Sequence, residues 1–171
     1  MKAKYIYILI MVVSHFSISY NANAQSFNPN DKIKGYISIA DPIFTTDKNG
    51  ITYNFDNGYT LSFPAGINII KSKTIAYSFE FAPTIKTIQG VSKMSNFTFH
   101  PGIIFRRPND FNILTRAAFE TSGRFGATLV FNKVYYKSND YAFWFAVPIP
   151  VRFGNNLPTS VSMALQFGFT F

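Results

Sequence analysis

The sequence contains no cysteine and few charged residues. The first absence excludes disulfide bridges, thiolate metal sites and a cysteine nucleophile. Only 14% of the residues are charged, whereas an ordinary soluble domain has roughly 25%. This shortage indicates that something other than water solvates much of the surface.

Metal, nucleotide and nucleic-acid sites also lack their usual residues. There are two histidines, the carboxylates are widely spaced, and no glycine-rich phosphate loop is present. The formal charge is +8, but the basic residues are scattered, with Arg106-Arg107 as the only adjacent pair. No basic stripe follows from this pattern, so we expect no metal, no cofactor and no nucleic acid.

No hydrophobic run is long enough for a membrane helix. Tyr5 to Val13 is continuously apolar, but a spanning helix needs roughly 20 residues. Lys2 and Lys4 precede this run, and Ala22-Asn23-Ala24 follows it. We therefore predict a signal peptide over residues 1–24, cleaved after Ala24. A short membrane anchor is the alternative. No linker divides residues 25–171, which we expect to form one domain.

What the sequence does have is aromatic residues in alternation. Aromatic residues make up 18% of the chain, with 20 phenylalanines. In the C-terminal stretch 160–171, every second residue is apolar and the residues between are small or polar. A period of two is typical of a β-strand with one apolar face.

The same period predicts eight strands, which would form an all-β, antiparallel up-and-down transmembrane β-barrel. The predicted strands are Ile33–Ala40, Tyr59–Ile70, Ile75–Thr84, Phe97–Arg106, Phe111–Thr121, Phe125–Tyr136, Tyr141–Phe153 and Ser160–Phe171. Short turns should alternate with generally longer loops, and 41–58 and 86–95 are the longest of these loops. Within the first, Ile51–Phe55 could form a hairpin extension or a ninth strand.

Volume predicts which face points outward. Eight strands enclose a narrow interior, and the bulky apolar side chains, among them Phe79, Phe81, Phe143 and Phe145, are too many to fit there. The opposite face carries small residues and charges, and charges facing lipid cost roughly 2–4 kcal/mol near the midplane. We expect a polar network in the lumen, formed by Glu80, His100, Arg106, Arg116, Glu120 and Arg152.

Three residues strain this pattern. The alternation places the large ring of Trp144 inside the barrel, where it either plugs the lumen or marks a slip in register. Pro148 and Pro150 share a parity within one strand, so two hydrogen-bond donors are missing toward the same neighbour. We expect a weak or bulged seam there.

From residue 25 to its end, the chain resembles the small bacterial outer-membrane β-barrel proteins. The C-terminal signature Leu165, Phe167, Phe169 and Phe171 is the most specific part of this resemblance. It implies an outer-membrane location, contact with outer-membrane lipids, and recognition by periplasmic chaperones and the barrel-assembly machinery. A monomer with a closed lumen and a structural, adhesive or binding role through its outer loops is the expected function.

Two alternatives remain open. A lipid-modifying enzyme of the acyltransferase or deacylase type would need a catalytic constellation, and Ser78, His100 and Glu80 are the only candidates for a relay. We expect no catalytic residues, because a structural role suits this histidine better. A soluble lipocalin-like barrel is the second alternative, and it would turn its apolar face inward.

Overall fold

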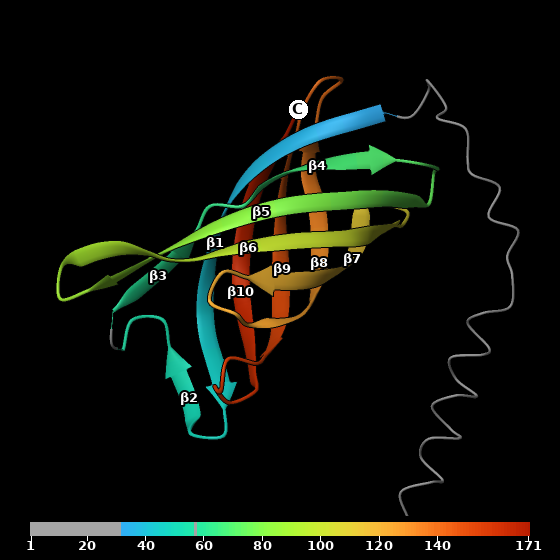
Figure 1. Cartoon of the computed structure of the whole chain (residues 1–171). Helices are drawn as coiled ribbons and strands as arrows, with labels where there is room; N and C mark the ends of the chain where they lie inside the picture. The colour runs from blue at the N-terminus through green and yellow to red at the C-terminus, as the bar shows by residue number, and fades with distance from the viewer. Residues whose placement is uncertain (1–31, 57) are drawn as a thin grey trace, which may run out of the picture. The chain divides into compact units, whose positions relative to one another are not determined.

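The computed structural model describes residues 32–56 and 58–171, and the predicted signal peptide lies outside these ranges. The described residues form one antiparallel sheet of ten strands (Figure 1). None of their helices is long and apolar enough to cross a membrane. The strands are β1 (Lys32–Asp47), β2 (Gly50–Tyr53), β3 (Tyr59–Ser62), β4 (Ala65–Ile70), β5 (Ile75–Ile88), β6 (Val91–Arg106), β7 (Phe111–Glu120), β8 (Phe125–Lys137), β9 (Ala142–Phe153) and β10 (Ser160–Thr170).

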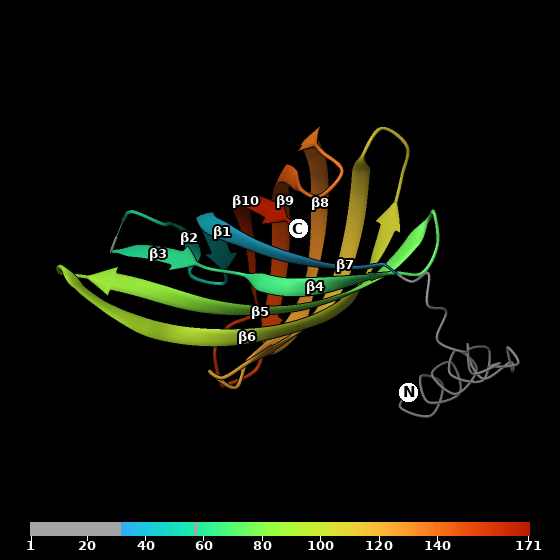
Figure 2. The same ribbon diagram turned by 90° about the horizontal axis from the view of Figure 1, so that it is seen from above.

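The sheet closes on itself because β1 pairs with β10, with Ile37 opposite Phe169. Strands β3 and β4 both lie between β1 and β5, so they are two pieces of a single crossing. Strand β2 pairs with β1 alone, as a hairpin extension. Ten strands therefore make eight crossings, which confirms the predicted eight-stranded barrel; Figure 2 shows the strands curving around a common interior.

Pro64 divides the β3–β4 crossing because proline has no N–H to donate to the ladder. The neighbouring groups remain satisfied. The Ser38 amide donates to the Pro64 carbonyl at 2.8 Å, and the Phe63 amide donates to the Pro83 carbonyl at 2.9 Å. The ring therefore continues across the interruption.

Two predicted boundaries are wrong, both on the side of the long loops. The first strand extends to Asp47, well beyond Ala40, and residues 86–95 are mostly a hairpin between β5 and β6 rather than a loop. Gln89 and Gly90 at its tip have φ values of 50° and 77°. Two successive left-handed residues match the twist of paired strands, so the alternation runs on through a turn.

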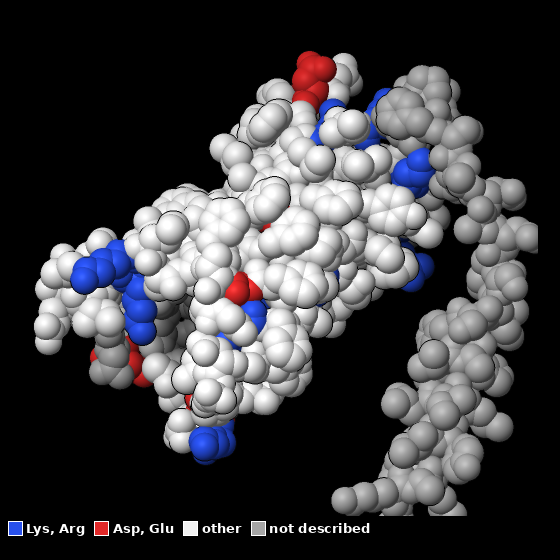
Figure 3. Space-filling model, in the orientation of Figure 1, with Lys and Arg blue, Asp and Glu red and all other residues white. Residues whose placement is uncertain are grey.

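The two faces of the barrel differ as predicted. Inward-facing Ser78, Ala82, Thr98, Ala118 and Ala146 are buried. The outward face carries large apolar side chains that stay exposed, including Ile37, Phe81, Phe119, Phe125 and Phe167. In Figure 3 this outer wall is largely uncharged between two ends that carry charged side chains. The apolar face is thus outside, opposite to the lipocalin-like arrangement.

Trp144 lies in the lumen and is 8% exposed. Gly168 on β10 makes this possible, because a Cβ atom there would lie 2.0 Å from the indole ring. The indole N–H donates to Thr170 Oγ1 at 2.9 Å, and the ring meets Tyr36 edge-on at 5.9 Å between centroids. The register of β8 against β9 shifts between Val134 and Tyr136, beside this ring. Trp144 therefore fills the lumen next to a bulge.

The prolines of β9 weaken one seam. Pairing between β9 and β10 stops after Val151–Val161 and resumes at Ala146–Gln166 in the same register. Pro148 and Pro150 occupy this interval, whereas their pairing with β8 on the other side is continuous. The interruption thus lies on the β10 side, as expected from two missing donors of one parity.

Candidate functional site

The polar and charged side chains of the lumen form the candidate functional site. Glu80 on β5 is paired directly with His100 on β6, so their side chains project from neighbouring positions of the lumenal face. Arg116 on β7 is paired with Gly102. A Cβ atom at Gly102 would lie 2.5 Å from Arg116 Cγ, so this glycine gives the arginine room to turn toward Glu80.

Glu80 and Arg116 form a buried ion pair in the middle of the lumen. Arg116 Nη1 donates to Glu80 Oε2 at 3.0 Å, and the two side chains are 5% and 3% exposed. The Tyr36 hydroxyl donates to the same carboxylate oxygen at 2.9 Å. Arg116 Nη2 donates to Tyr36 Oη and to Ser78 Oγ, each at 3.1 Å. Three strands, β1, β5 and β7, are thereby tied together around one carboxylate.

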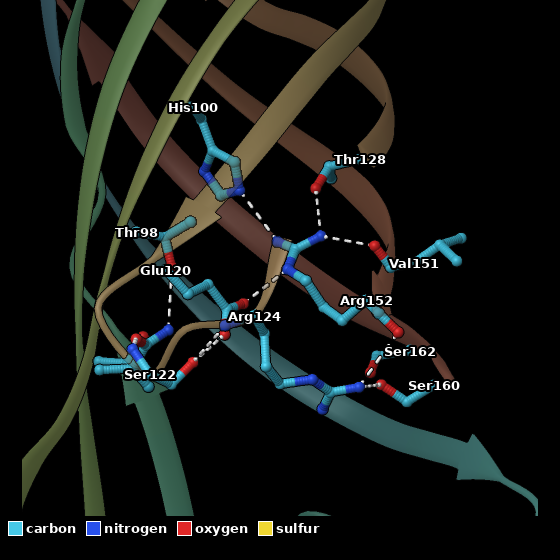
Figure 4. A network of polar contacts seen from close by, with 12 residues as sticks. Thr98, His100, Glu120, Ser122, Arg124, Thr128, Val151, Arg152, Ser160 and Ser162 are labelled. Carbon is cyan, nitrogen blue, oxygen red and sulfur yellow. Dashed lines mark hydrogen bonds and ion pairs between the residues drawn. The ribbon is translucent and has the colours of Figure 1, made fainter. Parts of the chain in front are cut away.

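A second ion pair lies nearer the end that carries the longer connections. Arg152 Nε donates to Glu120 Oε1 at 2.6 Å, and Ser122 Oγ donates to the other carboxylate oxygen at 2.8 Å. Arg124 Nη2 donates to the Pro158 carbonyl at 2.8 Å and to Ser160 Oγ at 3.1 Å. Figure 4 shows these side chains converging from different strands.

His100 joins the two ion pairs. Its Nδ1 lies 3.0 Å from Glu80 Oε1, and its Nε2 lies 3.0 Å from Arg152 Nη2 (Figure 4). Because a guanidinium only donates, Nε2 must accept. The imidazole is therefore neutral, with its proton on Nδ1, and donates to Glu80. One continuous chain of polar contacts runs from Arg116 through Glu80, His100 and Arg152 to Glu120.

The structure brings five of the six predicted network residues together, and Arg106 is the exception. Arg106 Nη1 donates to the carbonyl of Ser72 in a short turn, at 3.0 Å. Its parity does place it on the lumenal face, but it stands at the strand end, where a turn carbonyl is nearer than any member of the network. Its inclusion in the network was wrong.

Tyr36 and Arg124 also take part in these polar contacts and were not predicted. Tyr36 shares the lumenal parity of Ser38 and is 2% exposed, but it belongs to the strand with the weakest sequence signal. Arg124 lies just before β8, in a segment that we expected to be a surface loop. For Tyr36 the alternation alone could have found the residue, whereas nothing in the pattern indicates that Arg124 reaches Ser160.

The contacts of His100 differ from those of a nucleophilic relay. Such a relay needs a serine hydroxyl on the imidazole nitrogen opposite the carboxylate. That nitrogen faces Arg152, and Ser78 Oγ accepts from Arg116 instead. Among the described residues, no group of three or more His, Cys, Asp or Glu side chains could hold a metal ion.

The network lines a cavity of about 280 Å³ whose other walls include Pro42, Pro64, Pro148 and Ala164. A smaller cavity of about 100 Å³ lies beside Tyr36 and Trp144. Arg116 lines both cavities, and the indole ring of Trp144 lines the smaller one.

The four residues of the C-terminal signature lie on β10 or directly after it. Leu165, Phe167 and Phe171 are exposed on the outer wall. Phe169 packs against Phe143, with 5.1 Å between ring centroids. Both backbone groups of Phe171 bond to Gly35 at 2.9 Å. The signature therefore coincides with the seam that closes the ring.

Comparisons with known proteins give only distant likenesses. No family model and no curated protein matches the chain. The de novo designed protein TMB2.3, solved by solution NMR, has a TM-score of 0.49 and 14% identity over 82% of this chain and 93% of its own. A structure described as de novo design of transmembrane β-barrels gives a TM-score of 0.43 and 10% identity, over 81% and 94%. The fold rests on the strand pairing described above.

Proposed function

We propose that this protein spans the bacterial outer membrane as a monomeric, closed β-barrel and acts through its outer hairpins in a structural, adhesive or binding role. The observation that carries the proposal is the division of the two faces. Large apolar side chains cover the outside, while buried ion pairs occupy the lumen. The apolar outer face can contact lipid tails without cost. Because the strands pair all the way round, no edge strand exposes unpaired backbone groups to hydrocarbon.

The outer hairpins support the binding role. The β5–β6 hairpin extends beyond the pairing of β6 with β7, which reaches only Thr98, and it exposes Ile88, Val91 and Met94. The β1–β2 extension exposes Ile51 and Tyr53 in the same way. Exposed large apolar side chains outside a lipid-facing belt are typical of contact surfaces.

A non-enzymatic role is part of the proposal, since both ring nitrogens of His100 are hydrogen-bonded, one to Glu80 and the other to Arg152. Export through the signal peptide, and delivery by periplasmic chaperones to the barrel-assembly machinery, complete it. The C-terminal phenylalanines, which lie along the closing seam, are the proposed recognition element.

The absence of cysteine gives a direct test, because any introduced thiol is unique. Lys93→Cys places a thiol near the tip of the β5–β6 hairpin, and Lys73→Cys places one in a short turn at the opposite end; both side chains are exposed. In intact cells a membrane-impermeant maleimide should label the Lys93→Cys variant but not the Lys73→Cys variant. After lysis it should label both. Equal labelling of both variants in a detergent-free soluble fraction would refute the proposal.

A further inference from the structure

The mouth of the barrel at the short turns forms a basic vestibule of about 340 Å³. Its cationic lining residues are Lys32, Lys34, Lys73, Arg106, Arg107 and Lys137. Asp110 is the one carboxylate among the described lining residues. Six positive groups against one negative group leave a formal excess of five positive charges around a small cavity. In Figure 3 basic side chains gather at this end, around the start of β1.

The strands aim several of these charges into the mouth rather than away from it. Lys32 and Lys34 share the parity of Tyr36, which is buried in the lumen. Arg106 shares the parity of lumenal Ile104. Lys137 is paired with Ala142, on the same face of β9 as Trp144. Cations that converge on one cavity repel each other, and a low-dielectric wall strengthens that repulsion.

Partners inside the described chain account for only part of this charge. Lys137 Nζ lies 3.6 Å from Asp110, and Arg106 is bound to the Ser72 carbonyl. The side chains of Lys32, Lys34, Lys73 and Arg107 have no hydrogen bond or ion pair with another described residue. In the other cavity, by contrast, both carboxylates are paired with arginines. Four cations that line this one cavity are thus left without such a partner among the described residues.

We propose that the basic vestibule binds a phosphate-bearing anion, which goes beyond the proposed function. A phosphate group carries close to two negative charges and several acceptor oxygens, so it can bridge lysine and arginine donors that a single carboxylate would leave unpaired. The vestibule adjoins Thr170 and Val134, next to the Trp144 ring. An anion therefore enters from the short-turn end and stops there.

The phosphate group could belong to a water-soluble compound or to a lipid headgroup. Pyrophosphate, a soluble probe without a lipid tail, distinguishes the two sources. The full chain, refolded in zwitterionic phosphatidylcholine nanodiscs, is titrated with pyrophosphate by calorimetry. Saturable binding indicates a soluble source. A second arm uses discs with mixed lipids and measures phosphatidylglycerol retained on the protein by native mass spectrometry. Retention without pyrophosphate binding indicates the headgroup.

The variants decide whether the vestibule is responsible. Lys34→Gln combined with Arg107→Gln should weaken whichever ligand binds by about tenfold or more, since the two substitutions remove two attractive charges from the cavity lining. The matched control, Lys48→Gln combined with Lys93→Gln, changes two cations at the other end and should bind as the wild type does.

Folding is checked separately, by heat-modifiable migration of each variant in unboiled gels. Lys34→Arg combined with Arg107→Lys keeps both charges and should retain binding. If neither ligand binds the wild type, or if the vestibule variant and the control variant bind equally, the proposal is overturned. That result would leave the labelling test of membrane location unaffected, so the two proposals can fail independently.

Discussion

Replacing Glu80 with Gln removes the negative charge at the centre of the lumen while keeping the size of the side chain. Glu80 accepts hydrogen bonds from Tyr36 and Arg116 and a third from His100. The Glu80 side chain is 3% exposed, so water cannot solvate the arginine charge that the substitution leaves unpaired. Breaking a buried ion pair from one side costs about 3–5 kcal/mol, because the remaining charge is left uncompensated. We expect a loss of that size in the free energy of unfolding.

The chain supplies its own probe for this measurement. Trp144 is the sole tryptophan and lies in the lumen, so its fluorescence follows urea unfolding of the barrel in micelles. Glu120→Gln is the matched control, since that carboxylate is 13% exposed and lies nearer the mouth. It should cost less than Glu80→Gln, because solvent screens a more accessible pair.

A double-mutant cycle separates the pair from its surroundings. Glu80→Leu alone and Arg116→Met alone should each destabilise the barrel, but the two combined remove both charges and should recover stability, with a coupling of roughly 0.5–3 kcal/mol. If Glu80→Gln costs less than about 1 kcal/mol, or if the two single losses simply add, the ion pair does not hold the lumen together and the reasoning is refuted.

Three further perturbations test the seam, the closure and the plug. Pro148→Val restores an N–H toward β10, so hydrogen exchange of 162–165 should slow; unchanged exchange would show that proline is not the cause of the gap. Phe169→Asp should abolish heat-modifiable migration, since a charge on the lipid face costs a few kcal/mol, whereas Lys93→Asp in the β5–β6 hairpin should not. Gly168→Ala should cost about 1–3 kcal/mol by overpacking against Trp144, and Trp144→Phe in the same chain should reverse most of that loss when urea unfolding is followed by circular dichroism, because the variant has no tryptophan.

The alternation of residue types predicts faces well and registers poorly. Parity alone places Glu80, His100, Arg116, Glu120 and Arg152 on the lumenal side, because a period of two leaves no other choice once the apolar face is outside. Which of these residues meet depends on strand pairing, and a shift by two residues would preserve every face while changing every partner. The direct Glu80–His100 pairing could therefore not be derived from the pattern.

The errors cluster where local chemistry replaces periodicity. Arg106 keeps its parity but binds a turn carbonyl, which no face rule can anticipate. The β5–β6 hairpin was missed because Gln89-Gly90 is a weaker turn signal than Asn-Gly or Asp-Gly. The interruption at Pro64, by contrast, is a local effect of one residue on one ladder, and a proline within a predicted strand marks it directly.

The closing pair β1–β10 joins segments that are among the most distant in sequence, since Gly35 bonds to Phe171. Contacts of such long range make folding slow, because the intervening chain must lose conformational entropy before the contact forms and stabilises the fold. Until then both edges present unpaired backbone groups beside rows of exposed phenylalanine and isoleucine, a combination that favours aggregation. Assembly of this barrel therefore depends on β10 pairing with β1 before the exposed edges associate with other chains.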